Sequence, residues 1–340
     1  MSERAEAANV QAPRRGLAAR LLGPLHVTGV FWYRIHHWAA RHVPEWTIRP
    51  LILVFTLLFF VALRRVGRNL RDNLVPVLGP AGPLAGGRRV WRTLHQFAWC
   101  LTERYEHLSG SRELAMEPEN VAAWTALAGT GRGFIVLTAH VAAWEAASSL
   151  ISDEQRRCVH LVREEEVDPR AHAFVRELLA ERSGDLMVTH FAGDPLLAMT
   201  LAAALERGEL VALQGDRPRA GGRSIGVELF GRRFELPVGP LALARLTGAP
   251  LLPVFAFRED RRRYRVAFRE PIVVASTDDR RADLRRAAER VGEGLEWAIR
   301  RAPHQWFCFG PAWAQAGEGS KRTLSSPRRS SSAPTEANTS

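Results

Sequence analysis

The chain has 340 residues, of which 46% are hydrophobic and 24% charged, and its formal net charge at pH 7 is +11. This content is ample for one large domain or two small ones. The three cysteines, Cys100, Cys158 and Cys308, form no C-x-x-C pair, which argues against a disulfide framework and for a reducing compartment.

The excess positive charge is carried by arginine, since Lys321 is the only lysine. Such a charge favours anionic lipid surfaces, phosphorylated substrates and acidic carrier proteins as partners. No zinc-finger spacing, RNA-binding signature or recognition-helix pattern accompanies it, so nucleic acid is not expected as a partner.

The N-terminal part predicts attachment to a membrane. Residues 1–24 form a polar segment without a secretory signal. Residues 25–71 are expected to be hydrophobic, membrane-associated helices, because they hold the thirteen-residue apolar run 51–63, aromatic side chains at 31–33 and flanking arginines. A spanning helix needs about 20 apolar residues, so an interfacial anchor on an anionic leaflet is favoured over a span. The alternative for the run is a buried core helix.

Residues 72–315 predict one α/β domain with a mostly parallel central sheet flanked by helices. A helical lead-in occupies 72–128, and strand and helix patterns then alternate. Strands are expected at 133–138, 158–162, 185–189, 209–213, 251–257 and 264–268, and helices from 144 and at 172–181, 195–206, 240–246 and 279–300. The Ser/Pro/Arg-rich tail 316–340 is expected to be disordered, since it cannot bury enough apolar surface.

His140 follows the apolar strand pattern directly, and Glu145 lies five residues further, where a helix is expected to begin. A carboxylate in the first helical turn can reach back to a histidine in the preceding turn and fix its tautomer, which suits a base that activates a hydroxyl. The alternative is a polar residue after a strand and a solvated acid favoured by the helix dipole. A metal site is not expected, because no Cys/His cluster lies nearby in sequence.

His140-x4-Glu145 resembles the H-x4-D/E signature of the lysophospholipid acyltransferase-like superfamily, and specifically the late acyltransferases of lipid A biosynthesis. Further segments are similar to the family's other blocks in consistent order over roughly 25–313: 208–218, 230–240, 247–254, 305–309 and the Arg68-Asn-Leu70 region. Two places depart from the family pattern: Ala142-Ala143 stands where Gly-Asn is common, and the chain continues from Phe309 as Gly310-Pro-Ala-Trp313. The first departure puts substrate identity in doubt more than reaction type.

The resemblance implies a glycerolipid acyltransferase-like fold with His140 and Glu145 as catalytic residues and Arg163, Asp216 and Arg217 as substrate-binding residues. Arg217 suits phosphate recognition, with Asp216 holding the turn or the arginine; the alternative is a structural Asp-Arg pair. Arg163 is placed near the acceptor, or else in an ion pair with the acidic run that follows it.

The resemblance further implies an O-acyltransferase at the cytoplasmic face of the inner membrane. It would move a fatty acyl chain from acyl carrier protein or coenzyme A to a hydroxyl of a glycolipid or lysophospholipid. No metal or bound organic cofactor is expected, since the thioester is a co-substrate. Two alternatives stay open: a mannoside or other glycolipid acyltransferase of the same superfamily, and a catalytically silent lipid-binding membrane protein.

Overall fold

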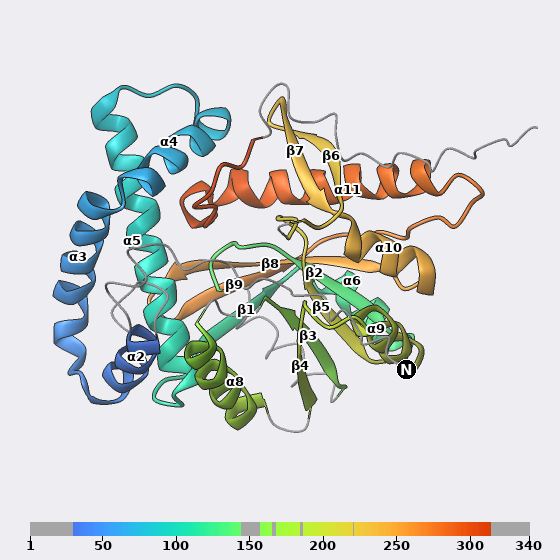
Figure 1. Cartoon of the computed structure of the whole chain (residues 1–340), viewed down its shortest axis with the longest axis horizontal. Helices are drawn as coiled ribbons and strands as arrows, with labels where there is room; N and C mark the ends of the chain where they lie inside the picture. The colour runs from blue at the N-terminus through green and yellow to red at the C-terminus, as the bar shows by residue number, and fades with distance from the viewer. Residues whose placement is uncertain (1–29, 144–156, 165–167, 184–185, 220, 314–340) are drawn as a thin grey trace, which may run out of the picture.

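The computed structural model describes residues 30–143, 157–164, 168–183, 186–219 and 221–313. A seven-stranded sheet of order β1-β9-β8-β2-β5-β3-β4 lies at its centre, with a separate hairpin of β6 and β7 (Figure 1). The strands are β1 (Ala115–Glu119), β2 (Phe134–Thr138), β3 (Val159–Arg163), β4 (Met187–Phe191), β5 (Leu210–Gln214), β6 (Ser224–Leu229), β7 (Arg232–Pro237), β8 (Leu251–Asp260) and β9 (Arg263–Phe268). The helices are α2 (Val30–His42), α3 (Glu45–Ala62), α4 (Arg64–Leu78), α5 (Pro83–Leu108), α6 (Val121–Gly129), α8 (Pro169–Ser183), α9 (Leu197–Glu206), α10 (Val238–Thr247), α11 (Arg280–Arg301) and the short 3-10 helix η3 (Pro303–Gln305).

The sheet is mostly parallel, which confirms the predicted α/β class. Strands β8, β2, β5, β3 and β4 run in one direction, whereas β9 pairs antiparallel with β8 and β1 runs parallel to β9. All five residues of β2 are buried, as expected for a central strand with both faces covered.

Helices cover both faces of this sheet. On one face Leu205 of α9, Leu241 of α10 and Leu295 of α11 share a core with Ile135 of β2. On the other face Trp124 of α6 packs edge-on against the Phe134 ring of β2. The domain is therefore a three-layer sandwich in which the central strand β2 is buried on both faces, whereas the edge strands β1 and β4 are partly exposed.

Two strand elements were not predicted from the sequence. Strand β1 contains Pro118, which suits an edge position because proline cannot donate to a ladder. The hairpin of β6 and β7 closes through Phe230 and Gly231, both with positive φ (49° and 68°), the backbone that a two-residue hairpin turn requires. A non-glycine residue at Phe230 weakens the usual turn signal.

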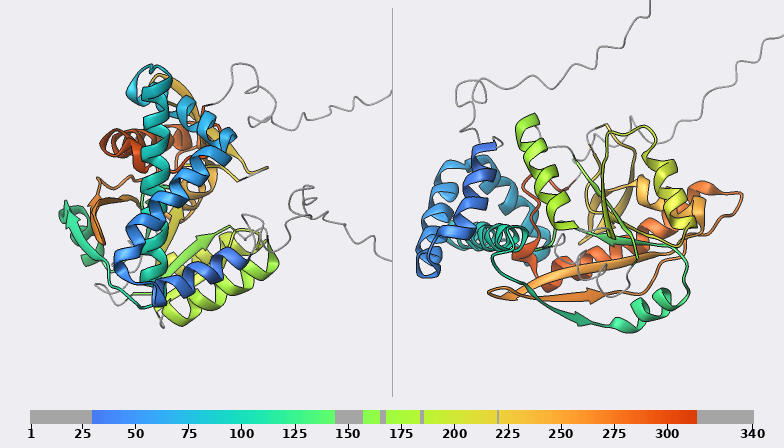
Figure 2. Two further views of the ribbon diagram at one scale, coloured as in Figure 1. Left: turned by 90° about the vertical axis from the view of Figure 1, so that its left-hand side faces the viewer. Right: turned by 90° about the horizontal axis from the view of Figure 1, so that it is seen from below.

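Helices α2 to α5 form a group beside one end of the sheet (Figures 1 and 2). Helix α3 packs lengthwise on α5: Thr56 lies 3.3 Å from the His95 ring nitrogen, and the Phe60 and Trp91 rings meet edge-on. Its other side is exposed, so α3 is not the buried core helix of the alternative interpretation. It is the one helix of the described residues long and apolar enough to cross a membrane.

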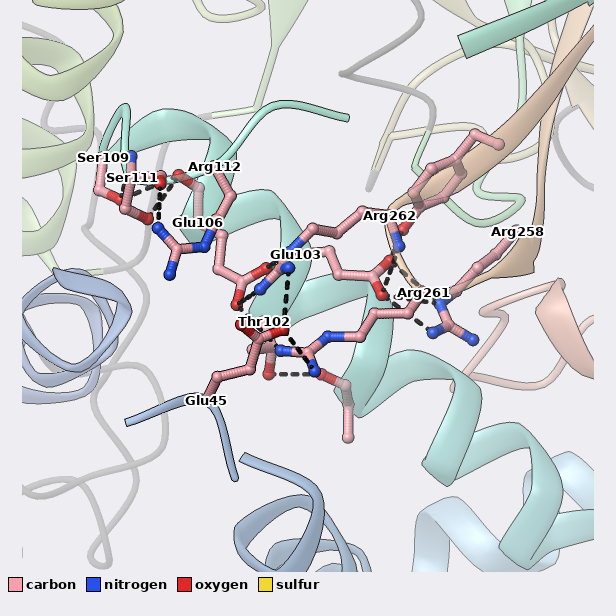
Figure 3. A network of polar contacts seen from close by, with 12 residues as sticks. Glu45, Thr102, Glu103, Glu106, Ser109, Ser111, Arg112, Arg258, Arg261 and Arg262 are labelled. Atoms are coloured by element: carbon pink, nitrogen blue, oxygen red, sulfur yellow. Dashed lines mark hydrogen bonds and ion pairs between the residues drawn. The ribbon is translucent and has the colours of Figure 1, made fainter. Parts of the chain in front are cut away.

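A buried polar network ties this helical group to the turn between β8 and β9 (Figure 3). The fully buried Glu103 of α5 accepts hydrogen bonds from the Arg258 guanidinium, the Tyr264 hydroxyl and the Arg262 amide. Arg262 also bonds Glu106 of α5 at 2.7 Å and Glu45 at the start of α3 at 3.1 Å. Buried charges are tolerated when paired and fully hydrogen-bonded in this way.

Some expectations fall outside the described residues: the polar segment 1–24, the tail 316–340 and the helix starting at residue 144. The expected division between anchor and domain at 71/72 falls inside α4. Leu70 of α4 is buried against Val90 and Leu94 of α5, so this helix packs on the rest of the chain.

Candidate active site

His140 and Asp216 meet at the carboxyl edge of two neighbouring parallel strands. Thr138, the last residue of β2, pairs with Gln214, the last residue of β5. His140 and Asp216 each follow two residues later, and His140 Nδ1 lies 2.8 Å from Asp216 Oδ1. Gly215 between Gln214 and Asp216 makes room for the Leu137 side chain, since a Cβ there would lie 2.8 Å from it.

The contact with Asp216 decides which nitrogen of His140 carries the proton. Arg217 Nε also lies 3.3 Å from Nδ1, but a guanidinium only donates and a carboxylate only accepts, so Nδ1 cannot serve both. The shorter contact to the buried carboxylate places the proton on Nδ1. The lone pair of the neutral ring is then on Nε2, the form that a general base needs.

Asp216 is an ionised carboxylate despite having no exposed surface. Burial alone raises the pKa of its carboxyl, but the charge and hydrogen bond of His140 and the charge of Arg217 outweigh burial and lower it to about 2. Its Oδ2 lies 3.9 Å from Arg217 Nε and has no hydrogen-bond partner among the described residues. Asp216 is therefore placed to balance the positive charge that His140 gains when its ring takes up a proton.

The turn after His140 is held by the last residue of η3 and the segment that follows it. The Phe307 amide donates to the His140 carbonyl at 2.9 Å, and the Ala142 amide donates to the Gln305 carbonyl at 3.0 Å. The Gln305 side chain in turn bonds both backbone groups of Arg258 on β8. Trp306 is buried beside Phe234 and packs in the core.

Ala142 adopts a left-handed backbone with φ of 46° and is buried. A backbone of this kind suits glycine, and an alanine there is strained by about 1–2 kcal/mol. The amides of Val141 and Ala142 already donate to the carbonyls of Ala139 and Gln305. These two amides are therefore already engaged in the backbone of the turn and do not offer donors to an oxyanion.

Hydrogen bonds from Asn73 of α4 fix the same C-terminal segment. Its buried side chain donates to the carbonyls of Cys308 and Gly310 at 2.8 Å and accepts from the Ala312 amide at 2.9 Å. Asn69 one turn earlier donates to the Phe309 carbonyl. Sequence reasoning noted the region around residues 68–70 but missed this positioning role, for which no local pattern exists.

Two further predicted site residues, Arg217 and Arg163, lie on or near the same edge. Arg217 follows Asp216, and Arg163 ends β3, the strand that pairs with β5 on its far side from β2. Both are partly exposed, so the edge carries positive charge in reach of solvent. Glu145 lies outside the described residues.

Cys308 lies close to the pair but is a poor nucleophile. It is buried, and burial raises the pKa of its thiol to about 11, partly offset by the Arg217 charge. Since the thiolate is the reactive form, Cys308 is inert at neutral pH.

Comparison with known proteins identifies the family. Residues 20–315 match the model of the bacterial lipid A biosynthesis acyltransferase family. The chain belongs to this family. In this lipid acyltransferase, His140 lies just after the central strand β2, at the end where open α/β sheets place ligands.

The acyltransferase also matches the crystal structure of the 1-acyl-sn-glycerophosphate (LPA) acyltransferase PlsC from Thermotoga maritima, with 17% identity and a TM-score of 0.35. The match covers 74% of this chain and 97% of that one. No curated protein sequence matches the chain.

Proposed function

We propose that this protein transfers a fatty acyl chain from an acyl thioester to a hydroxyl of a glycolipid or lysophospholipid. The donor is the thioester of acyl carrier protein or coenzyme A, with no metal or organic cofactor in the transfer. The observation that carries the proposal is the His140–Asp216 pair on adjacent parallel strands of a lipid acyltransferase family member.

His140 acts as general base in this proposal. Its Nε2 takes the proton of the acceptor hydroxyl as the oxygen attacks the thioester carbonyl, and Asp216 stabilises the imidazolium that forms. Collapse of the tetrahedral intermediate breaks the C–S bond, and the imidazolium returns its proton to the leaving thiolate. Glu145 is proposed as a second carboxylate that orients the ring.

Arg163 and Arg217 are proposed to bind phosphate groups of donor or acceptor. Arg217 follows β5, the neighbour of β2, and Arg163 ends β3 on the far side of β5. A planar guanidinium binds phosphate through paired hydrogen bonds. Arg217 is the closer of the two, since its Nε reaches the His140 ring.

We further propose that the enzyme works at the cytoplasmic face of the inner membrane with α3 lying in the interface. The outward side of α3 is apolar, with Leu57, Leu58 and Val61 more than half exposed. Its start is tied to the β8–β9 turn through Glu45, and its end leads directly into α4, which packs on the domain. Because α3 is held to the domain at both ends and along its length, a position in the membrane interface suits it better than a position across the bilayer.

The experiment is a comparison of lipids from a strain lacking the gene with those of the same strain after its restoration. Mass spectrometry of total lipids is expected to show one lipid class that lacks a single acyl chain in the deletion strain. That class supplies the acceptor for an assay with purified enzyme and each thioester donor. Identical lipid profiles, together with no thiol release from either donor, would favour the lipid-binding alternative.

A further inference from the structure

A second group of potential ligands lies at the opposite edge of the sheet from His140. Cys158 directly precedes β3, His160 is the second residue of β3, and Glu209 directly precedes β5. Since Val159 pairs with Leu210, Cys158 and Glu209 are neighbours across the two strands. Residues two apart on a strand share a face, so all three side chains lie on the same side at the amino ends.

The polar atoms of these side chains converge on one point. His160 Nε2 lies 2.8 Å from Glu209 Oε2 and 3.6 Å from Cys158 Sγ. The three ligand atoms lie within 4.8 Å of one another. Zinc bonds of about 2.3 Å to sulfur and 2.0 Å to nitrogen place tetrahedral S and N ligands roughly 3.5 Å apart, which matches the sulfur–nitrogen separation.

Neighbouring side chains orient His160 and Glu209. His160 Nδ1 lies 2.8 Å from His190 Nε2 of β4, and the two rings are stacked with centroids 5.1 Å apart. Arg207 at the end of α9 holds both Glu209 oxygens, at 3.0 and 2.6 Å. Metal-bound histidines normally donate their second N–H to such a partner, and metal-bound carboxylates are themselves hydrogen-bonded.

We propose that Cys158, His160 and Glu209 bind a zinc ion, with water in the fourth position and His190 and Arg207 as outer supports. A thiolate, an imidazole and a carboxylate together select zinc over magnesium or calcium, which prefer oxygen alone. The site is distinct from the acyl-transfer chemistry, since it lies at the other end of the strands. Its effect is to fasten the starts of β3 and β5 together.

Binding changes the protonation of the group in a defined way. Burial, with the Glu209 charge acting in the same direction, raises the pKa of the Cys158 thiol, so the metal-free residue is neutral. Zinc displaces that proton to solvent. With zinc bound, the His160 proton is on Nδ1 and is donated to His190 Nε2, so His190 carries its own proton on Nδ1.

The test uses the full chain purified in detergent, stripped with a chelator and titrated with zinc against a competing chelating dye. One zinc per chain is expected by elemental mass spectrometry, with a raised melting temperature. Cobalt in place of zinc should give a thiolate-to-metal charge-transfer absorption. Cys158→Ser should remove this absorption and weaken zinc binding by at least 100-fold, because it deletes a ligand.

Further variants separate ligand loss from unfolding. His190→Phe keeps the stacked ring but removes the outer partner of His160, and should weaken zinc binding about 10–100-fold. Glu209→Gln should also weaken it, whereas Cys100→Ala, a buried thiol elsewhere, should leave affinity and stoichiometry unchanged. The proposal is overturned if the wild-type chain takes up no stoichiometric zinc, or if its affinity survives both Cys158→Ser and Glu209→Gln.

Discussion

The proton on His140 Nδ1 is held by a carboxylate with no exposed surface, which is an unusual place for a charge. Asp216 stays ionised there because His140 and Arg217 lie beside it, at 2.8 Å and 3.9 Å. The general-base proposal depends on that charge, since the imidazolium formed during transfer needs a counter-ion.

Asp216→Asn is therefore expected to lower kcat by about 10²-fold or more, within the range of general-base catalysis, with little change in KM. Asparagine keeps the shape and can accept from Nδ1, but it cannot balance the imidazolium. The measurement is acyl transfer at saturating donor, with circular dichroism as the folding control. A folded Asp216→Asn enzyme with wild-type kcat would show that this carboxylate plays no part in the chemistry.

The lowered pKa of Asp216 also predicts that the free energy of unfolding falls at acid pH. The pKa of Asp216 is lowered from 3.8 to about 2, so its stabilising contribution is fully present above roughly pH 4 and is lost as pH falls toward 2. The contribution amounts to about 2 kcal/mol. Denaturant unfolding of wild type and Asp216→Asn between pH 2 and 6 should give free energies whose difference changes only below pH 4. A difference independent of pH over that range would contradict the assignment.

At the scale of elements, the C-terminal segment from Gln305 onward holds the turn after His140 in place. It bonds the backbone of His140 and Ala142 on one side and the side chains of Asn73 and Asn69 on the other. This segment connects α4 to the active site, although the two are far apart in the chain.

Asn73→Ala is expected to lower the free energy of unfolding by roughly 2–4 kcal/mol. The substitution leaves two carbonyls and one amide of the C-terminal segment without their hydrogen-bond partner. Asn69→Ala, which removes one hydrogen bond, should cost less, about 1 kcal/mol. Chemical denaturation of both variants measures the difference. Equal and negligible costs would mean that the segment is held by its aromatic packing alone.

Periodicity in the sequence predicted most of the helices and strands and the position of His140 at a strand end. It could not predict that Asp216 meets His140, because local patterns do not give the order of strands in a sheet. β2 and β5 are neighbours although β3 and β4 lie between them in the chain. The contacts of Asn73 and the cluster of Cys158, His160 and Glu209 could not be predicted for the same reason, since each joins distant segments.

At the scale of the whole molecule, the helical group carries the surface that we expect to meet the membrane. The outward side of α3 is apolar, while the arginines of α4 follow it directly. Anionic lipid headgroups would contact those arginines when the apolar side enters the interface.

The triple change of Leu53, Leu57 and Leu58 to Asn should release the protein from anionic vesicles in a flotation assay. All three side chains are at least half exposed, so the fold should survive. A matched triple change at the exposed Met199, Leu246 and Val273 should float like wild type. Alkaline carbonate should extract the wild-type protein if α3 lies in the interface; retention in the pellet would instead indicate a crossing helix.

The most direct test of the proposed general-base mechanism is the rate of acyl transfer by His140→Ala. The assay follows a labelled acyl chain from carrier protein or coenzyme A into the lipid acceptor, with His42→Ala, an exposed histidine on α2, as the matched control. The account predicts a folded His140→Ala enzyme slower by at least ~10²–10⁴-fold and a control at the wild-type rate. Near-normal turnover by folded His140→Ala would contradict the mechanism and remove the histidine from the chemistry.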